Sequence, residues 1–216
     1  MHVDIVIDTI CPWCYVGKRR FERALAIGQR SDIAIGWRAF QLNPDLPAPG
    51  IDRATYLAQK FGDAARAATR YAPLIEAGAQ EGIDFRFNRI MRTPNTVLSH
   101  RLVRYAARHG RGAETVEGIF RSYFTEGVDI GAAEVLGELA ASIGLNAGEV
   151  RRYLASEADD DAVREEDAMA RGLGINGVPC FIIDGRYAVS GAQSPEIFLQ
   201  VFGLAREGQA AEAAAE

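Results

Sequence analysis

Cysteine is scarce in this chain, which has three cysteines in 216 residues. Small domains that depend on disulfides for stability contain cysteine at a much higher density. A framework of structural disulfides is therefore excluded. The chain is long enough to be stabilised by an ordinary hydrophobic core, either as one large domain or as one domain with an insertion.

Metal ligands are equally sparse. A structural zinc site needs four ligands, usually two cysteine pairs or a cysteine pair with a nearby histidine pair. One cysteine pair is present, and no second pair or close histidine pair accompanies it, so we expect no metal site. The cysteines and histidines of the chain are Cys11, Cys14, Cys180, His2, His100 and His109.

Long hydrophobic runs and an excess of positive charge are also absent. No stretch approaches the roughly 18 apolar residues of a membrane span. Asp4 and Asp8 interrupt the apolar run at the N-terminus, which therefore does not resemble a secretory signal. The net charge of −5 gives no general affinity for nucleic acid or anionic membranes. We therefore expect a cytoplasmic protein that has neither nucleic acid nor a membrane as its partner.

The sequence does contain a cysteine pair at a strand-to-helix junction. Cys11-Pro12-Trp13-Cys14 follows a predicted strand over 3–8 and opens a predicted helix over 11–29. The N-terminus of a helix favours negative charge, and the thiolate is the form of cysteine that attacks disulfides. Cys14 lies one helical turn from Cys11 and can close a disulfide with it. The junction therefore predicts a dithiol–disulfide redox site.

The rest of the pattern predicts an α/β fold of order βαβ…ββα with a large all-helical insertion. Periodicity and capping signals indicate, in order, a strand over 33–39, a loop over 41–50, helices over most of 52–172, a helix start at Thr93-Pro94, strands over 180–183 and 187–189 joined at Asp184-Gly185, and a last helix from Ser194 to about Ala205. We expect one discontinuous domain over 1–50 and 173–208. The insertion would cover 51–172, and 209–216 would be a flexible tail.

A second signal stands directly before the returning strand. Gly177-Val178-Pro179 precedes Cys180, and a proline at the first residue of a strand is by itself an ordinary loop feature. Paired with the upstream cysteine motif, it favours a functional interpretation.

At this point the chain resembles the DsbA-type thioredoxin-fold family, and within it the FrnE-like cytoplasmic oxidoreductases. The resemblance rests on Asp8, Cys11-Pro12-Trp13-Cys14-Tyr15, the helical insertion, Gly177-Val178-Pro179 and Ser190-Gly191-Ala192-Gln193. It implies a thioredoxin fold in which Pro179 is a cis-proline facing the active-site disulfide. The backbone of Val178 would then bind an incoming peptide or glutathione in a strand-like manner.

In this interpretation Cys11 is the nucleophile and Cys14 resolves the mixed disulfide. Pro12 and Trp13 would shape the rim of the substrate site, and Gln193 would bind the polar end of a peptide or glutathione. The substrate would be a thiol or disulfide, in a protein or a small molecule. Glutathione is a possible co-substrate, no cofactor is required, and the protein would be a monomer or a homodimer.

Three further residues have two interpretations each. Asp8 would relay protons to Cys14 if it is buried, or else cap the end of the strand. His100 would face the site from the insertion, or else have a structural role. Cys180 would exchange with the cysteine pair, or else fill a buried position in a strand, which we favour.

A group of arginines in the insertion is interpreted as a mostly solvated face, in which one or two side chains would be reserved for an anionic substrate. Its members are Arg86, Arg89, Arg92, Arg101, Arg104 and Arg108.

Two other functions stay open. The same broad family includes glutathione-dependent isomerases of the 2-hydroxychromene-2-carboxylate type, which typically have serine at the position matching Cys11. Here both thiols are present, which favours thiol–disulfide exchange. A non-catalytic, chaperone-like module with an unused cysteine pair is the other alternative.

Overall fold

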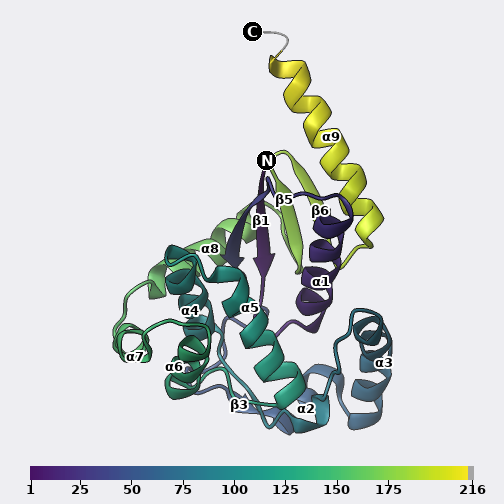
Figure 1. Cartoon of the computed structure of the whole chain (residues 1–216). Coiled ribbons are helices and arrows are strands. Elements are labelled where there is room, and N and C mark those ends of the chain that lie inside the picture. The colour runs from purple at the N-terminus through teal and green to yellow at the C-terminus, as the bar shows by residue number, and fades with distance from the viewer. Residues whose placement is uncertain (214–216) are drawn as a thin grey trace.

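The computed structural model describes residues 1–213, and Figure 1 shows helices surrounding a small sheet. The strands are β1 (His2–Ile7), β2 (Ala34–Ala39), β3 (Ile51–Asp52), β4 (Arg92–Thr93), β5 (Cys180–Ile183) and β6 (Tyr187–Ser190). The helices are α1 (Pro12–Ile27), α2 (Arg53–Phe61), α3 (Ala64–Gln80), α4 (Val97–Arg108), α5 (Gly112–Arg121), α6 (Ala133–Ser142), α7 (Ala147–Ala155), α8 (Asp160–Gly172) and α9 (Pro195–Ala213). A 3₁₀ turn, η1 (Phe87–Arg89), and a π-helical turn, η2 (Ser122–Glu126), complete the helical region.

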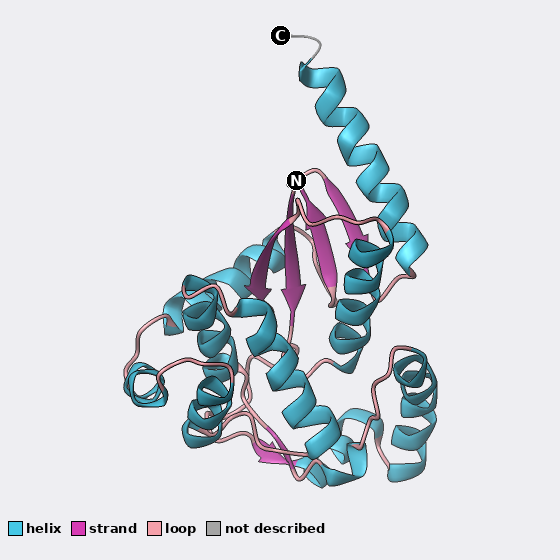
Figure 2. Cartoon of the chain, in the orientation of Figure 1, coloured by secondary structure: helices cyan, strands magenta, loops and turns pink. Residues whose placement is uncertain are grey.

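The main sheet has four strands in the order β2-β1-β5-β6. β1 and β2 are parallel, because α1 connects them and returns the chain to the same edge. β5 is antiparallel to β1, and β6 is antiparallel to β5. This topology confirms the predicted βαβ…ββα order around one mixed sheet, shown in magenta in Figure 2.

Successive side chains of the central strands enter two different layers, as the pleat of a strand requires. Phe181 of β5 packs on Phe21 of α1, with ring centroids 5.3 Å apart. Cys180, one residue earlier, packs with Val6 of β1 and Ala170 of α8. α1 and α9 therefore cover one face of the sheet, and α8 covers the other.

One hydrophobic core continues from the sheet into the helical insertion. Tyr15 of α1 stacks on Phe120 of α5 with ring centroids 5.2 Å apart. Both belong to the same buried cluster as Phe21 and Phe181 of the sheet layer. The insertion thus packs directly against the helix that begins at the cysteine pair.

The predicted helix start at Thr93 and Pro94 is wrong. Thr93 lies in β4 and pairs with Ile51 of β3, and α4 begins at Val97. The carboxamide oxygen of Asn95 accepts a hydrogen bond from the Val97 N–H at 3.0 Å. A strand pairing between segments far apart in sequence overrides the local capping signal here, and periodicity contains no information about it.

The last helix is longer than expected and includes the first residues of the predicted flexible tail over 209–216. α9 continues through Ala213, and residues 214–216 lie outside the described part of the chain. Alanine and glutamate are strong helix formers, which explains why the helix passes the expected end near Ala205. In Figure 1, α9 extends well beyond the edge of the sheet.

Within residues 1–213, no helix is long and apolar enough to cross a membrane.

Candidate active site

Cys11 is the N-cap residue of α1. β1 ends at Ile7, and the chain turns so that the Cys11 N–H donates to the carbonyl oxygen of Asp8 at 3.0 Å. Pro12 occupies the first helical turn, where a missing N–H costs no hydrogen bond. The Cys11 thiol donates to the carbonyl oxygen of Val178 at 3.4 Å. Its sulfur therefore lies at a helix N-terminus, against the loop that precedes β5.

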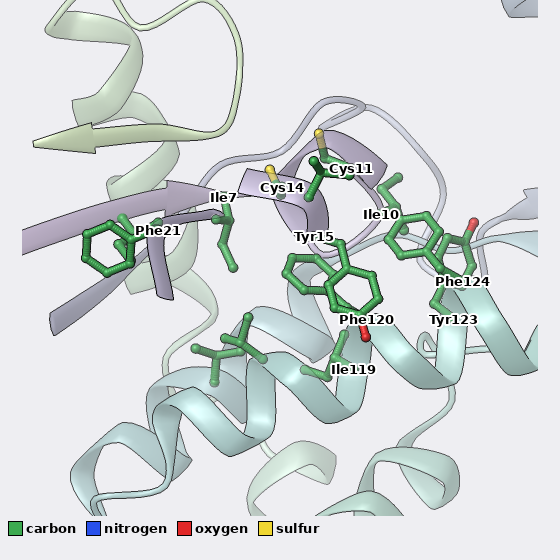
Figure 3. Packing of buried hydrophobic residues seen from close by; sticks show 14 of the residues in the cluster. Ile7, Ile10, Cys11, Cys14, Tyr15, Phe21, Ile119, Phe120, Tyr123 and Phe124 are labelled. Carbon is green, nitrogen blue, oxygen red and sulfur yellow. The ribbon is translucent and has the colours of Figure 1, made fainter. Parts of the chain in front are cut away.

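Cys14 lies in the first turn of α1 and is fully buried, and both cysteines are free thiols. Burial raises the pKa of the Cys14 thiol well above its ordinary value. The hydrogen bond and charge of Cys11 and the carboxylate of Asp8 add to this rise, whereas the backbone N–H of Asp8 opposes it. Cys14 therefore keeps its proton in the dithiol state. Figure 3 shows both sulfurs pointing away from Tyr15 and the aromatic cluster beneath them.

The loop before β5 packs closely on α1. The Val178–Pro179 peptide bond is cis. A Cβ atom added at Gly17 of α1 would lie 2.7 Å from Cγ of Pro179 and 3.4 Å from Cα of Ala192. Because real Cβ atoms do not approach so closely, Gly17 is what allows this loop to lie against the helix.

Asp8 and His100 meet beneath the cysteine turn. Asp8 is fully buried, and its Oδ2 accepts a hydrogen bond from the Leu42 N–H at 2.7 Å. Nε2 of His100 lies 3.6 Å from Oδ1 of Asp8 and 3.2 Å from the carbonyl oxygen of Phe40. The structure thus places Asp8 against Cys14, and it places His100 of the insertion against Asp8.

Cys180 lies apart from the cysteine pair. Its side chain packs with Val6, Phe40 and Ala170 on the face of the sheet that α8 covers. Burial raises the pKa of its thiol. This environment favours the interpretation of Cys180 as a small buried side chain.

A cavity of about 320 Å³ opens beside Cys11. Pro12, Trp13 and Val178, three of the predicted substrate-binding residues, line it together with Cys11. Trp13 is 38% exposed, so its ring forms part of the mouth of the cavity. The cysteine turn and the cis-proline loop therefore form one wall of the cavity.

Gln193, the fourth predicted substrate-binding residue, does not line this cavity. Its side-chain amide donates to the carbonyl oxygen of Ser190 at 2.8 Å. The side chain is exposed on the turn before α9, so its predicted contact with substrate stays a prediction.

The opposite wall of the cavity comes from α2 and α3, whose residues the sequence analysis missed. Three are cations, three are aromatic and one is a leucine: Arg53, Lys60, Arg70, Tyr56, Phe61, Tyr71 and Leu74. No motif marks them, because they are spread over two helices. The sequence pattern also does not show that these helices fold back onto the cysteine turn.

Arg101 is an exception within the predicted, mostly solvated arginine face, since it is 2% exposed. Its guanidinium donates to the carbonyl oxygens of Tyr153, Ser156 and Ala158. Arg101 therefore satisfies the carbonyls at the end of α7, where a helix leaves its last acceptors without partners.

Among residues 1–213, no group of three or more histidine, cysteine, aspartate or glutamate side chains is placed to hold a metal ion.

Comparison with known proteins gives a consistent result. The family described as "DSBA-like thioredoxin domain" matches residues 2–203. A probable DsbA oxidoreductase from Streptomyces coelicolor is 36% identical, with a TM-score of 0.88 over 96% of this chain and 90% of that one.

Two more distant solved structures share the fold. A 2-hydroxychromene-2-carboxylate isomerase is 16% identical, with a TM-score of 0.69 over 100% of both chains. The cytosolic disulfide reductase DsbM from Pseudomonas aeruginosa, solved with GSH, is 19% identical, with a TM-score of 0.62 over 88% of this chain and 90% of that one.

Proposed function

The chain belongs to the DsbA-like thioredoxin domain family, and from this premise we propose that it is a thiol–disulfide oxidoreductase that works through Cys11 and Cys14. The observation that carries the proposal is the position of Cys11. Its sulfur lies at the N-terminus of α1, at the mouth of a cavity and against Val178 of the cis-proline loop. Cys14 lies behind it as a buried, protonated thiol.

The proposed reaction has two exchange steps. The Cys11 thiolate attacks one sulfur of a substrate disulfide, the substrate S–S bond breaks, and one substrate thiolate leaves. Cys14 then loses its proton and attacks the Cys11 sulfur of the mixed disulfide, which releases the second substrate thiolate. The substrate gains two electrons and the protein forms a Cys11–Cys14 disulfide. The same two steps in the reverse direction oxidise a dithiol substrate.

The difference in burial between the two cysteines suits this order of events. Cys11 has 4% of its surface exposed beside the cavity, whereas Cys14 has none. A thiol that stays protonated until the mixed disulfide forms does not compete with Cys11 for substrate. We further propose that the protein acts in the cytoplasm, where such a pair is kept mostly reduced between turnovers. The name of the cytosolic reductase DsbM, which shares the fold, supports this location.

The redox equilibrium of the pair against glutathione tests the proposal. Protein equilibrated in buffers of graded glutathione and glutathione disulfide is trapped by acid, alkylated and weighed by mass spectrometry. We expect a single two-electron transition between dithiol and Cys11–Cys14 disulfide. In Cys14→Ser we expect a mixed disulfide with glutathione to accumulate on Cys11, and in Cys11→Ser we expect neither species. A pair that never closes would contradict the proposal.

A glutathione-dependent isomerase is the second candidate. The cavity beside Cys11 is large enough for a small-molecule substrate, and the isomerase noted above has the same fold. This function does not need a resolving thiol. Isomerase turnover with glutathione that survives in Cys14→Ser would favour it over disulfide exchange.

A chaperone-like binding module needs neither thiol. It predicts that the double variant Cys11→Ser/Cys14→Ser protects an unfolded client from aggregation as well as the parent does. If this double variant no longer protects the client from aggregation, the chaperone-like function is excluded.

A further inference from the structure

The cavity beside Cys11 has an unusual distribution of charge. Three cations, Arg53, Lys60 and Arg70, line it, and no aspartate or glutamate does. The chain as a whole carries a net charge of −5, so this concentration of positive charge is local. Within residues 1–213, none of the three cations forms an ion pair with a carboxylate, although many other arginines of the chain do. The wall facing Cys11 is therefore positive and uncompensated.

Neutral groups hold two of these cations in place. Arg53 donates to the hydroxyl of Tyr71 at 2.7 Å and to that of Thr93 at 3.1 Å. Lys60 donates to the hydroxyl of Tyr56 at 2.6 Å. Nε of Arg53 is buried and has no hydrogen-bond partner among the described residues. The side chains are thus positioned while their charge stays available to an anion.

Aromatic rings supply the rest of the wall. Tyr71 stacks on Phe87 with ring centroids 4.2 Å apart, and Phe61 meets the edge of Tyr71 at 5.9 Å. Trp13 forms part of the mouth of the cavity and also borders a second hollow, which Lys60 and Arg70 line as well. Such rings favour a planar or otherwise apolar group over a strongly hydrated one.

We propose that this cavity binds a low-molecular-weight disulfide that carries a carboxylate and a planar apolar group. The carboxylate lies on Lys60, Arg70 and Arg53, the apolar group lies among the aromatic rings, and one sulfur of the disulfide faces Cys11. A volume of about 320 Å³ is that of a small-molecule site. The inference rests on the proposed function, because it names the class of substrate for the same thiol.

The reaction with such a substrate follows the exchange proposed above. The Cys11 thiolate bonds to the near sulfur, the substrate S–S bond breaks, and the carboxylate-bearing thiolate leaves. The cations stabilise the approach of the anionic disulfide, which would otherwise be repelled by the attacking thiolate. Positive charge at this position therefore selectively increases the rate at which Cys11 reacts with anionic disulfides.

The test compares four disulfides with reduced protein. They are 5,5′-dithiobis(2-nitrobenzoate), which is anionic and aromatic, 4,4′-dithiodipyridine, which is neutral and aromatic, bis(2-hydroxyethyl) disulfide, which is neutral and aliphatic, and cystamine, which is cationic. Each second-order rate constant is divided by that of dithiothreitol with the same probe, which removes the intrinsic reactivity of the disulfide. We expect the largest ratio for the anionic aromatic probe and the smallest for cystamine.

Lys60→Gln and Arg70→Gln are the decisive variants, because both side chains are exposed at the cavity and their loss leaves the core intact. Each is expected to lower the ratio for the anionic probe about three- to tenfold and to lower the ratios for the neutral probes much less. Arg164→Gln is the matched control, since it removes the same charge from an exposed position on α8. Equal ratios for anionic and neutral probes would overturn the inference and leave the proposed function standing.

A binding measurement without redox chemistry separates the two proposals. Isothermal titration of Cys11→Ser with 2-naphthoate and with uncharged 2-naphthalenemethanol is expected to show tighter binding of the carboxylate, weakened by Lys60→Gln. Such binding together with no exchange for any disulfide would overturn the proposed function and retain the anion site. A disulfide within an acidic peptide is a further probe. If its rate-constant ratio exceeds that of the small anionic probe and falls in the same way in Lys60→Gln and Arg70→Gln, the small-molecule assignment is overturned.

Discussion

At the scale of single residues, the chemistry of the site depends on what surrounds Cys14. Burial has the largest effect on the pKa of its thiol, the neighbouring Cys11 raises that pKa further, and the negative charge of the Asp8 carboxylate makes the smallest addition. Asp8 is itself fixed by the Leu42 N–H and lies beside His100. We therefore expect Asp8 to act as a positioning residue that influences the cysteine pair through Cys14.

The first prediction concerns Asp8→Asn. Removing the negative charge is expected to lower the pKa of Cys14, which nevertheless stays above its ordinary value because the thiol is still buried. Resolution of a mixed disulfide on Cys11 should therefore reach its maximum rate at lower pH than in the parent. Stopped-flow measurement of that step across pH provides the test.

Asp4→Asn is the matched control for this prediction. Asp4 lies on β1, the strand that leads to Asp8, and Asp4→Asn is the same change from carboxylate to amide. The partners of Asp4 are His2 and Arg38 on the surface. Its pH profile should match that of the parent. A profile unchanged in Asp8→Asn would show that the carboxylate of Asp8 does not influence Cys14.

At the scale of elements, α1 holds the site together, because it contacts both the cis-proline loop and the helical insertion. Gly17 lets the loop approach, and on another side Lys18 and Tyr15 meet Glu117 of α5. The helix that begins at Cys11 is therefore in direct contact with both the loop and the insertion.

Gly17→Ala is expected to slow disulfide exchange and to destabilise the protein. Alanine in a helix normally gains roughly 0.5–1 kcal/mol over glycine, but here its Cβ would collide with Pro179. Displacement of the loop should outweigh that gain. Gly203→Ala in α9, where nothing lies within 4 Å of the added Cβ, is expected to stabilise the protein without changing exchange. Thermal melts and exchange rates of the two variants check this, and equal stabilisation in both would contradict the close packing at Gly17.

Glu117 supports a partly buried charge cluster between α1 and α5. Its carboxylate accepts hydrogen bonds from Lys18, which is 3% exposed, and from Tyr15, each at 2.7 Å. Burial pushes the pKa of Glu117 upwards, but Lys18, Tyr15 and Arg19 together outweigh this, so the pKa lies below its ordinary value of 4.5. Because its pKa is lowered, the ionised carboxylate stabilises the folded protein fully above pH 4.5. This stabilisation is lost as the pH falls through the pKa that the group has in the folded protein.

Glu117→Gln is therefore expected to lower the free energy of unfolding by about 2–3 kcal/mol at pH 7, because it leaves a buried ammonium with one carboxylate fewer. The deficit relative to the parent should shrink as the pH falls below the ordinary pKa of the carboxyl group. Denaturant titrations of the variant and the parent at several pH values measure this difference in the free energy of unfolding. Glu114→Gln on the same helix removes an exposed pair with Arg111 and should cost at most about 0.5 kcal/mol. A deficit that does not depend on pH would contradict the electrostatic account.

At the scale of the whole molecule, the sheet and the insertion share one core although they are distinct in sequence. The cluster of Tyr15, Phe120 and Phe124 continues from α1 into α5 and η2. Asp8 and His100 make a second connection across the same boundary. The site itself lies at this boundary, with the cysteine turn on one side and α2 and α3 on the other.

Unfolding is therefore expected to be one cooperative transition, with calorimetric and van't Hoff enthalpies that agree. Scanning calorimetry of the full chain, together with fluorescence and circular dichroism melts, provides the measurement. Two separated transitions would show that the predicted insertion over 51–172 folds independently of the rest. Coincident melts would show that the shared core governs stability.

How much of this could be predicted from sequence differs between elements. The strand before Cys11, the helix after it and the βαβ…ββα order follow from local periodicity, and the structure confirms them. The start of α7 also follows a local signal, since the side chain of Asn146 accepts hydrogen bonds from the Gly148 and Glu149 N–H groups. In contrast, Thr93 carries a valid capping signal but lies in a strand, because Ile51 pairs with it.

The sequence by itself therefore determined the cysteine pair, its position at the start of a helix and the order of strands and helices along the chain, because each depends on residues that are neighbours along the chain. Only the tertiary structure decided which residues surround that pair. It brought His100 to Asp8, turned Cys180 to the opposite face of the sheet and gathered Arg53, Lys60 and Arg70 opposite Cys11. Those placements arise from packing between segments far apart in sequence, which no local pattern of residues encodes.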